Sequence, residues 1–204
     1  MKRSFDLVVF DWEGTLGDPL GHVMDELYKQ SQAMGLGAFD ASLARQHMTL
    51  GLEYVIKKLF PRVSLSQAEQ LLHVVQRSLV ATHQDSILFP GVLRLLRALK
   101  AEKIDRAVAT NNNQQALARA LHHTGLEGFF TVTRAAGQVP LKPCPQMLEE
   151  IMGVCAVDPS RTLMIGDSMA DIEMAAFAGA HSVGIDFYYQ QEEALKRAGA
   201  QLVF

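Results

Sequence analysis

The sequence predicts an α/β protein: a doubly wound parallel sheet with a small all-helical segment inserted after the first strand. Three observations support this prediction. The apolar run 7–10 is typical of a buried strand, and it ends on Asp11. The segment 17–87 has apolar residues at helical spacing and no alternating strand pattern. From Pro90 onward, short apolar strands alternate with helices of roughly ten residues, which is the pattern of parallel βαβ units.

Composition and charge restrict the class of protein. The chain has 204 residues, of which 49% are hydrophobic and 20% are charged, and these values are typical of a globular protein with a packed core. Its formal net charge is −3, and no run of Lys and Arg forms a basic stripe that could neutralise a phosphate backbone. We therefore expect no nucleic acid among its partners.

We expect a cytoplasmic protein without a membrane partner. Residues 1–3 carry the charge of a signal peptide, but only four apolar residues stand between Asp6 and Asp11, too few for its apolar region. No apolar run approaches the ~18 residues that span a bilayer. Cys144 and Cys155 lack the spacing of a Cys-x-x-Cys motif and fit reduced thiols. We also expect a monomer, with a dimer left open.

The segment after the first strand is predicted to be a separate helical domain. Apolar residues recur at helical spacing within 23–34, and those of 65–79 mark a longer amphipathic helix. The predicted domains are therefore an α/β core of 1–16 and 88–204 and a helical domain of 17–87.

The remaining elements alternate between helix and strand. Pro90 and Gly91 open the first helix, and Gly125 and Gly179 close two later ones. The expected helices are 90–102, 114–123, 145–152, 172–178 and 191–198, and the expected strands are 105–110, 129–133, 162–165, 182–185 and 202–204.

Polar residues stand at the carboxyl ends of three predicted strands. Asp11 ends the first strand, Thr110 and Asn111 end the second, and Asp167 follows the strand 162–165. In open α/β sheets, ligands bind in the crevice beyond the carboxyl ends of the strands. We therefore expect these side chains to converge at one edge of the sheet.

Four motifs occur in a fixed order along the chain, and together they resemble those of the haloacid dehalogenase superfamily of phosphotransferases. The resemblance covers 5–204, and the helical insertion is similar to the type 1 cap of that family. It implies a Rossmann-type core, and the run Pro-Gly-x-x-x-Leu-Leu at 90–96 is closest to phosphoglycolate-phosphatase-like members. The motifs are Asp11-x-Glu13-Gly14-Thr15, Thr110-Asn111, Lys142-Pro143 and Gly166-Asp167-Ser168-x-x-Asp171.

The resemblance implies hydrolysis of a phosphomonoester of a small phosphorylated metabolite. Asp11 would attack the phosphorus atom and form an aspartyl-phosphate. Glu13 would protonate the leaving oxygen and then deprotonate the hydrolytic water. Thr110 and Asn111 would bind the phosphoryl oxygens through the threonine hydroxyl and nearby amides. Lys142 would neutralise charge between the nucleophile and the phosphate.

The same resemblance implies a Mg²⁺ cofactor. Asp11 and Asp167 offer the hard oxygen ligands that Mg²⁺ prefers, and the backbone carbonyl of Glu13 would be a further ligand. Asp171 would bind the metal or its waters. Carboxylates crowded at one sheet edge repel one another without a cation, which is a further reason to expect a metal. Ser168-x-x-Asp171 also fits a helix capping box, a compatible second role.

Glu13 departs from the resemblance, because phosphatases of this family normally carry aspartate there. Its stem is longer by one C–C bond, ~1.5 Å, and misplacing a catalytic group by about 1 Å can cost on the order of 100-fold in rate. Glu13 could act in a widened site, the activity could be low, or another leaving group could be favoured.

Three alternatives to a phosphatase follow from this departure. The form Asp-Trp-x-Gly-Thr at 11–15 also resembles phosphonoacetaldehyde hydrolases, which use a cap lysine as a Schiff base, and Lys57 or Lys58 could take that role. A dehalogenase of the superfamily needs no leaving-group acid. A degenerate member would bind phosphate compounds or a partner protein with little activity.

Overall fold

The computed structural model describes residues 4–81 and 87–204. The charged start 1–3 and the stretch 82–86 of the predicted helical domain lie outside the described residues.

The chain divides into two compact units. The predicted domains, a core of 1–16 and 88–204 and a helical domain of 17–87, remain a prediction. Among the described residues, the division differs from them by including 17–18 and 87 in the first unit and by adding a distant segment, 187–190, to the second. Among the described residues, the core unit takes 4–18, 87–186 and 191–204, and the helical unit takes 19–81 and 187–190.

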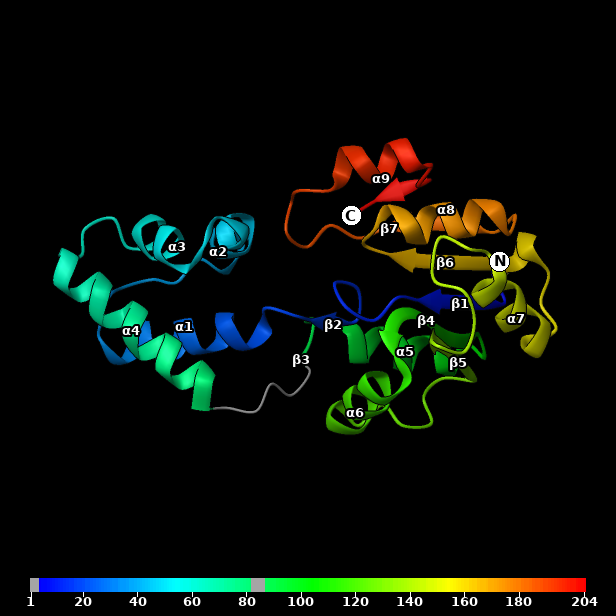
Figure 1. The fold of residues 1–204 in the computed structure, drawn as a ribbon, viewed down its shortest axis with the longest axis horizontal. Coiled ribbons are helices and arrows are strands. Elements are labelled where there is room, and N and C mark those ends of the chain that lie inside the picture. Colours follow the sequence, from blue (N-terminus) through cyan, green and yellow to red (C-terminus); the bar gives the residue numbers. More distant parts are fainter. Residues whose placement is uncertain (1–3, 82–86) are drawn as a thin grey trace. The chain divides into compact units, whose positions relative to one another are not determined.

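The core unit contains a parallel sheet, so the predicted fold class is confirmed. Within the described residues the sheet has six strands, and every neighbouring pair is parallel (Figure 1). In sheet order the strands are β5 (Val132–Ala136), β4 (Asp105–Asn113), β1 (Leu7–Phe10), β6 (Thr162–Gly166), β7 (His181–Gly184) and β8 (Leu202–Val203).

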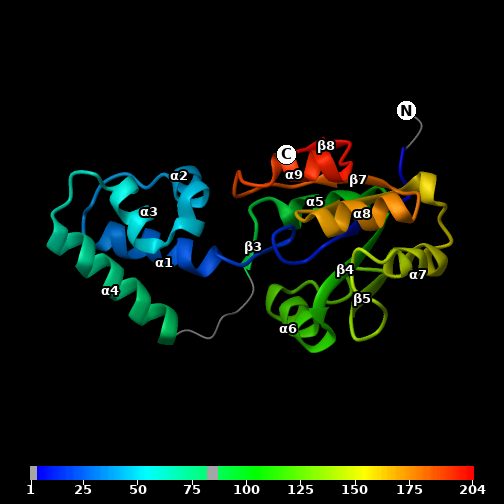
Figure 2. The same cartoon turned by 45° about the horizontal axis from the view of Figure 1, so that its top comes forward.

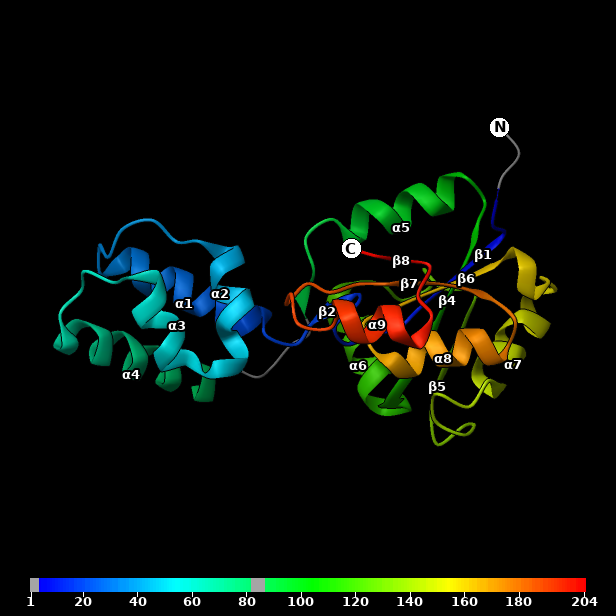
Figure 3. The ribbon, with the colours of Figure 1, turned by 90° about the horizontal axis from the view of Figure 1, so that it is seen from above.

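The order of the strands creates a switch point at β1. From β1 the chain proceeds outward to β4 and β5, then returns to β6 on the other side of β1 and proceeds to β7 and β8. Figure 3 shows α5 on one side of the sheet and α8 and α9 on the other. Ligands bind at such switch points in doubly wound sheets. The helices of this unit are α5 (Val92–Ala101), α6 (Gln114–Thr124), α7 (Gln146–Cys155), α8 (Met169–Phe177) and α9 (Glu192–Ala198).

Strand β1 is the centre of the core. All four of its residues are buried, as expected for a parallel strand covered on both faces. Leu7 and Val9 are fully buried in a cluster with side chains of β4, β6, α7 and α8, which places α7 and α8 on the same face of the sheet. The register pairs Phe10 with both Val108 and Ile165, so the last residue of β1 lies level with these residues of its two neighbouring strands.

The helical unit has a hydrophobic core of its own. Its helices are α1 (Gly21–Ala33), α2 (Ala41–His47), α3 (Leu52–Leu59) and α4 (Leu65–Ala81) (Figure 2). Asp40 caps α2 by accepting a hydrogen bond from the Leu43 backbone N–H at 3.0 Å. The buried core residues of this unit are Met24, Leu27, Ala44, Met48, Val55, Ile56, Phe60, Ala68, Leu71 and Val75.

The segment 187–190 joins the helical unit through contacts with α2. The Tyr189 hydroxyl lies 3.3 Å from Ser42 Oγ, and the Gln190 side chain donates to the Gln46 carbonyl at 3.3 Å. The Arg45 guanidinium lies over the ring of Tyr188, 5.9 Å from its centroid. The sequence pattern did not predict this association, because it joins two segments that are far apart in the chain, by 147 positions for Ser42 and Tyr189.

Two predicted elements require correction. The segment predicted to be only helical begins and ends in short strands, because β2 (Gly17–Asp18) pairs antiparallel with β3 (Ile87–Leu88). The predicted strand 129–133 lies three residues too early. Phe129 belongs to the loop after α6, where its carbonyl accepts a hydrogen bond from the Arg106 side chain at 2.9 Å, and β5 starts at Val132.

None of the helices among the described residues is long and apolar enough to cross a membrane.

Candidate active site

Asp11 stands at the point where β1 leaves the sheet. Its backbone N–H donates to the Ile165 carbonyl at 2.9 Å, which continues the pairing of β1 with β6 by one residue. Asp11 is buried, with 8% of its surface exposed. Its Oδ1 atom lies 2.7 Å from the Lys142 ammonium nitrogen. The end of β1 therefore places a buried carboxylate next to the positively charged Lys142 side chain.

The turn after Asp11 is fixed by its backbone. The Leu16 and Gly17 N–H groups both donate to the Trp12 carbonyl, at 3.0 and 2.7 Å, and the Gly14 N–H donates to the Gly17 carbonyl at 2.9 Å. Gly14 has a φ of +81°, a conformation that residues with a side chain rarely adopt. A Cβ atom there would also lie 2.1 Å from Asp167 Oδ2, so only glycine fits this position.

Glu13 is exposed in this turn. Its side chain has no hydrogen-bond or ion-pair partner among the residues that the structure describes. Within the described part of the chain, no polar partner therefore restrains this carboxyl group, for which the resemblance implies acid–base chemistry.

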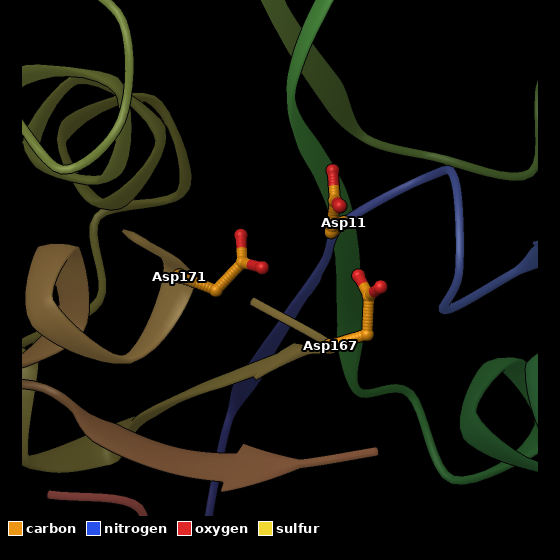
Figure 4. Close-up of side chains that lie close together, drawn as sticks. All are labelled: Asp11, Asp167 and Asp171. Carbon is orange, nitrogen blue, oxygen red and sulfur yellow. The ribbon is translucent and has the colours of Figure 1, made fainter. Parts of the chain in front are cut away.

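Three carboxylates gather at this edge of the sheet. Asp11 follows β1, Asp167 follows β6, and Asp171 lies in the first turn of α8 (Figure 4). Each offers an oxygen atom, and these atoms lie within 4.8 Å of one another. The Asp171 carboxylate packs against Gly166, where a Cβ atom would lie 2.3 Å from its Cγ.

Lys142 connects two of these carboxylates. Its ammonium nitrogen lies 2.7 Å from Asp11 Oδ1 and 2.6 Å from Asp171 Oδ1, and it donates to the Ala109 carbonyl at 3.1 Å. Only 3% of its side-chain surface is exposed. A buried charge is tolerated when it is paired and hydrogen-bonded, and Lys142 meets both conditions.

Asp171 has structural partners on both carboxylate oxygens. Oδ1 faces Lys142, and Oδ2 accepts hydrogen bonds from the Ser168 backbone N–H at 3.1 Å and from the Ser168 hydroxyl at 2.6 Å. The capping box that the sequence indicated at Ser168 and Asp171 is therefore present at the start of α8.

Burial, together with neighbouring charge, raises the pKa of two of these carboxylates, Asp11 and Asp167. Burial raises the pKa of Asp11 to about 6; the Asp171 charge adds to this rise and the Lys142 charge opposes it. Burial also raises the pKa of Asp167 to about 7, together with repulsion from Asp11 and Asp171. Burial alone would lower the pKa of Lys142, but attraction to Asp11 and Asp171 outweighs it, and this pKa is raised.

The donor set fits a divalent metal ion. When Asp11, Asp167 and Asp171 are all ionised, their three negative charges exceed the single positive charge of Lys142 by two. Carboxylate oxygens are the ligands that Mg²⁺ prefers, and a divalent cation would balance this excess. The raised pKa values of Asp11 and Asp167 agree with this, because uncompensated negative charge contributes to both.

Thr110 and Asn111 lie at the same edge, on β4. Thr110 is 2% exposed, and its Oγ1 accepts a hydrogen bond from the Asn112 backbone N–H at 3.1 Å. The Asn111 side chain is bonded to the backbone of Lys142 rather than directed at the carboxylates. The predicted contacts of Thr110 and Asn111 with substrate stay a prediction.

The structure thus brings most of the predicted site residues together: Asp11, Asp167, Asp171 and Lys142 are in mutual contact or within metal-binding reach. Their catalytic, substrate-binding and metal-binding roles, and that of Glu13, stay predictions. The sequence reasoning did not single out Thr15, which is buried and whose hydroxyl donates to Asp167 Oδ1 at 3.4 Å. The sequence feature that could have pointed to Thr15 is its position directly after Glu13 and Gly14 in the first motif.

A comparison with known protein families identifies the family of this chain. The model of the haloacid dehalogenase-like hydrolases matches residues 5–179 of the chain. The chain therefore belongs to this family of hydrolases.

The relatives within the family are distant. The phosphoglycolate phosphatase of Pseudomonas putida is 24% identical over 204 residues, which cover 97% of this chain and 75% of that protein. The phosphoglycolate phosphatase of Vibrio cholerae is 26% identical over 210 residues, covering 98% of this chain and 93% of that protein.

Solved structures agree on the fold. A predicted phosphoglycolate phosphatase from Haemophilus somnus has a TM-score of 0.65 at 21% identity, with 100% of this chain and 95% of that chain covered. CbbY from Rhodobacter sphaeroides, in complex with xylulose 1,5-bisphosphate, has a TM-score of 0.62 at 22% identity, with 98% and 93% covered.

Proposed function

We propose that this chain is a Mg²⁺-dependent phosphomonoester hydrolase that acts on a small phosphorylated metabolite through an aspartyl-phosphate. One observation carries the proposal. The Asp11 carboxylate lies 2.7 Å from the Lys142 ammonium group and shares an edge of the sheet with Asp167 and Asp171, all within metal-binding reach. This arrangement supplies a nucleophile and positive charge for the phosphoryl oxygens.

The first step forms the covalent intermediate. A carboxylate oxygen of Asp11 attacks the phosphorus atom, and the bond between phosphorus and the leaving-group oxygen breaks. Glu13 gives its proton to the leaving oxygen, so that an alcohol departs rather than an alkoxide. Lys142 stays beside Asp11 and attracts the phosphoryl oxygens, which lowers the repulsion between the anionic nucleophile and the anionic substrate.

The second step regenerates the enzyme. Glu13, now ionised, takes a proton from a water molecule as the water oxygen attacks phosphorus. The bond between phosphorus and the Asp11 oxygen breaks, inorganic phosphate leaves, and Asp11 returns to its ionised form. The exposed position of Glu13 supports this double role, because its side chain can meet both the leaving group and water.

Asp11 and Asp167 would hold the metal ion directly, with the backbone carbonyl of Glu13 as a further ligand. Asp171 would act on the metal or its waters, and its bonds to Lys142 and Ser168 favour the second role. When bound, Mg²⁺ neutralises negative charge that develops on the phosphoryl oxygens.

The substrate that we propose is phosphoglycolate-like. The relatives from Pseudomonas putida and Vibrio cholerae are phosphoglycolate phosphatases, and each matches nearly the whole chain. The complex of CbbY with xylulose 1,5-bisphosphate adds small sugar bisphosphates as a second group to examine.

The test is phosphate release by the purified protein from a panel of small phosphorylated metabolites, with and without Mg²⁺. The panel includes 2-phosphoglycolate and xylulose 1,5-bisphosphate. We expect release from at least one compound, dependent on Mg²⁺. If no compound releases phosphate, the proposed function is wrong.

A second candidate is a low-activity member that binds phosphate compounds. The observation that favours it is Glu13, which replaces the usual aspartate and whose side chain has no described partner to fix its position. Binding of panel compounds by calorimetry without turnover would support this candidate.

Two further assays address the remaining alternatives. A phosphonoacetaldehyde hydrolase would release acetaldehyde, and borohydride would trap its lysine. Lys57, one lysine considered for that role, is exposed on α3 and pairs with Glu53 at 2.6 Å. A dehalogenase would release halide from a haloacid without needing Glu13.

A further inference from the structure

The side chain of Asn111 is bonded through both its oxygen and its nitrogen to the backbone of one residue, Lys142. Its Oδ1 atom accepts a hydrogen bond from the Lys142 backbone N–H at 2.9 Å. Its Nδ2 atom donates to the Lys142 carbonyl oxygen at 3.3 Å. The two residues are 31 positions apart in the sequence. One amide side chain therefore ties a distant backbone segment to the edge of the sheet.

The two partners differ in their structural setting. Asn111 belongs to β4, beyond Val108, the last residue that pairs with β1, and between Ala109 and Asn113, where the pairing of β4 with β5 shifts register. Lys142 lies in the connection between β5 and α7, outside any helix or strand. Its ammonium nitrogen nevertheless has to reach Asp11 and Asp171. A side chain near the end of β4 thus bonds the backbone from which the loop lysine extends.

Asparagine suits this task for a chemical reason. The backbone of Lys142 presents a donor and an acceptor to residue 111, and an amide side chain offers the complementary acceptor and donor. An aspartate has nearly the same shape and still accepts from the N–H group. Its second oxygen would face the carbonyl oxygen, so one hydrogen bond would be replaced by repulsion.

We propose that Asn111 is a positioning residue that holds the Lys142 backbone and thereby sets the place of the Lys142 ammonium group beside Asp11. The catalytic consequence rests on the proposed phosphatase function. The placement of the Lys142 ammonium group does not depend on that function, because the labelling experiment below measures it without any substrate.

The chain offers a matched control two residues away. Asn113 caps α6 by accepting a hydrogen bond from the Ala116 backbone N–H at 2.9 Å. Its amide nitrogen has no partner within the described part of the chain. Aspartate serves as well as asparagine at such a helix cap. Asn111→Asp and Asn113→Asp therefore make the same chemical change, but only the first removes a donor that is in use.

The first experiment measures how fast the Lys142 amine reacts with an acylating reagent in the native protein, with mass spectrometry of the labelled peptide. Only 3% of the Lys142 side chain is exposed. The labelling rate therefore measures how often the Lys142 side chain leaves its buried position beside Asp11 and Asp171. We expect Asn111→Asp to raise the labelling rate about tenfold, because one of the two hydrogen bonds that hold the Lys142 backbone is replaced by repulsion. Asn113→Asp should remain near the wild-type rate.

Asn111→Ser completes this experiment, because it removes both bonds without adding a charge. It should raise the labelling rate as Asn111→Asp does. A wild-type rate in both Asn111 variants would overturn the proposal. An equal rise in Asn113→Asp would overturn it as well, because the effect would then be a general loosening.

The second experiment uses a substrate found by the metabolite panel. We expect kcat of Asn111→Asp to fall about 100-fold, with Asn113→Asp unchanged. In a Lys142→Ala background, Asn111→Asp should cost little more, since its effect acts through the lysine. Full additivity would overturn the proposal. A protein without phosphatase activity would refute the proposed function, and the labelling rates would still decide the role of Asn111.

Discussion

The carboxylate of Asp167 occupies the space that a side chain on residue 14 would need. A Cβ atom there would lie 2.1 Å from Asp167 Oδ2 and 2.4 Å from its Cγ. The turn after Asp11 and the acid that follows β6 therefore fit closely against each other, and a side chain at position 14 would displace the Asp167 carboxylate.

Gly14→Ala should consequently displace Asp167. We expect Mg²⁺-dependent turnover to fall on the order of 100-fold, because catalytic groups move by about 1 Å. Gly128→Ala is the control, since Gly128 also has a positive φ, of +72°, but a Cβ atom added there would have no other atom within 4 Å. Both variants carry backbone strain, so equal losses of activity in the two would show that strain alone is responsible.

Asp11→Asn should abolish turnover and leave the fold intact. The amide cannot form the aspartyl-phosphate, and we expect a loss on the order of 10³-fold or more. The melting temperature of the metal-free protein should not fall, because the variant removes one charge from a crowded cluster. Steady-state kinetics and thermal unfolding measure the two effects, and substantial residual turnover would exclude Asp11 as the nucleophile.

The gain in stability from Mg²⁺ should increase with pH. The folded-state pKa values of Asp11 and Asp167 are raised to about 6 and about 7, from 3.8. Protons on these groups therefore stabilise the metal-free fold below about pH 4, and this contribution is lost as the pH rises through 6 to 7. Mg²⁺ competes with the same protons, so it binds best above about pH 7.

Thermal unfolding with and without Mg²⁺ at about pH 5 and about pH 8 measures this effect. At a concentration of about 100 Kd, the ion should raise the melting temperature by roughly 5–10 °C at the higher pH and by much less at the lower. Asp167→Asn should remove most of the gain at the higher pH. An equal gain at both pH values would contradict the prediction.

Glu13→Gln should act differently on different leaving groups. Removing the proton donor should slow hydrolysis of an alkyl phosphate by about 100-fold or more, whereas p-nitrophenyl phosphate, whose leaving group needs no proton, should lose less in the first step. Glu13→Asp keeps the acid and should lie between the wild type and Glu13→Gln. Equal losses on both substrates would argue against Glu13 as the acid. Burst and steady-state kinetics separate the two steps.

The sequence predicted the parts of the site that depend on strand ends. Asp11 and Asp167 follow buried apolar runs, and parallel strands bring their carboxyl ends to one edge, so their proximity follows from the pattern. The place of Lys142 depends instead on the conformation of a loop without helical or strand periodicity. Its contact with Asp171 and its bonds to Asn111 were therefore beyond the reach of pattern analysis.

Loop conformation also explains the remaining differences. Phe129 and Phe130 are apolar and resemble the start of a strand, yet they lie between the end of α6 and the start of β5. The short pairing of β2 with β3 involves only two residues on each side, too few for a periodic signal. The contacts of 187–190 with α2 arise from tertiary structure and have no counterpart in local sequence.

The membership of 187–190 in the helical unit has a consequence for recombination between relatives. An exchange of 17–87 alone would bring a foreign α2 against Tyr188 and Tyr189, without the side chains that contact them here, Arg45 and Ser42. A chimaera that carries both segments from one donor preserves these contacts. The helical part of this protein is therefore encoded by two separate pieces of the gene, and both should come from the same donor.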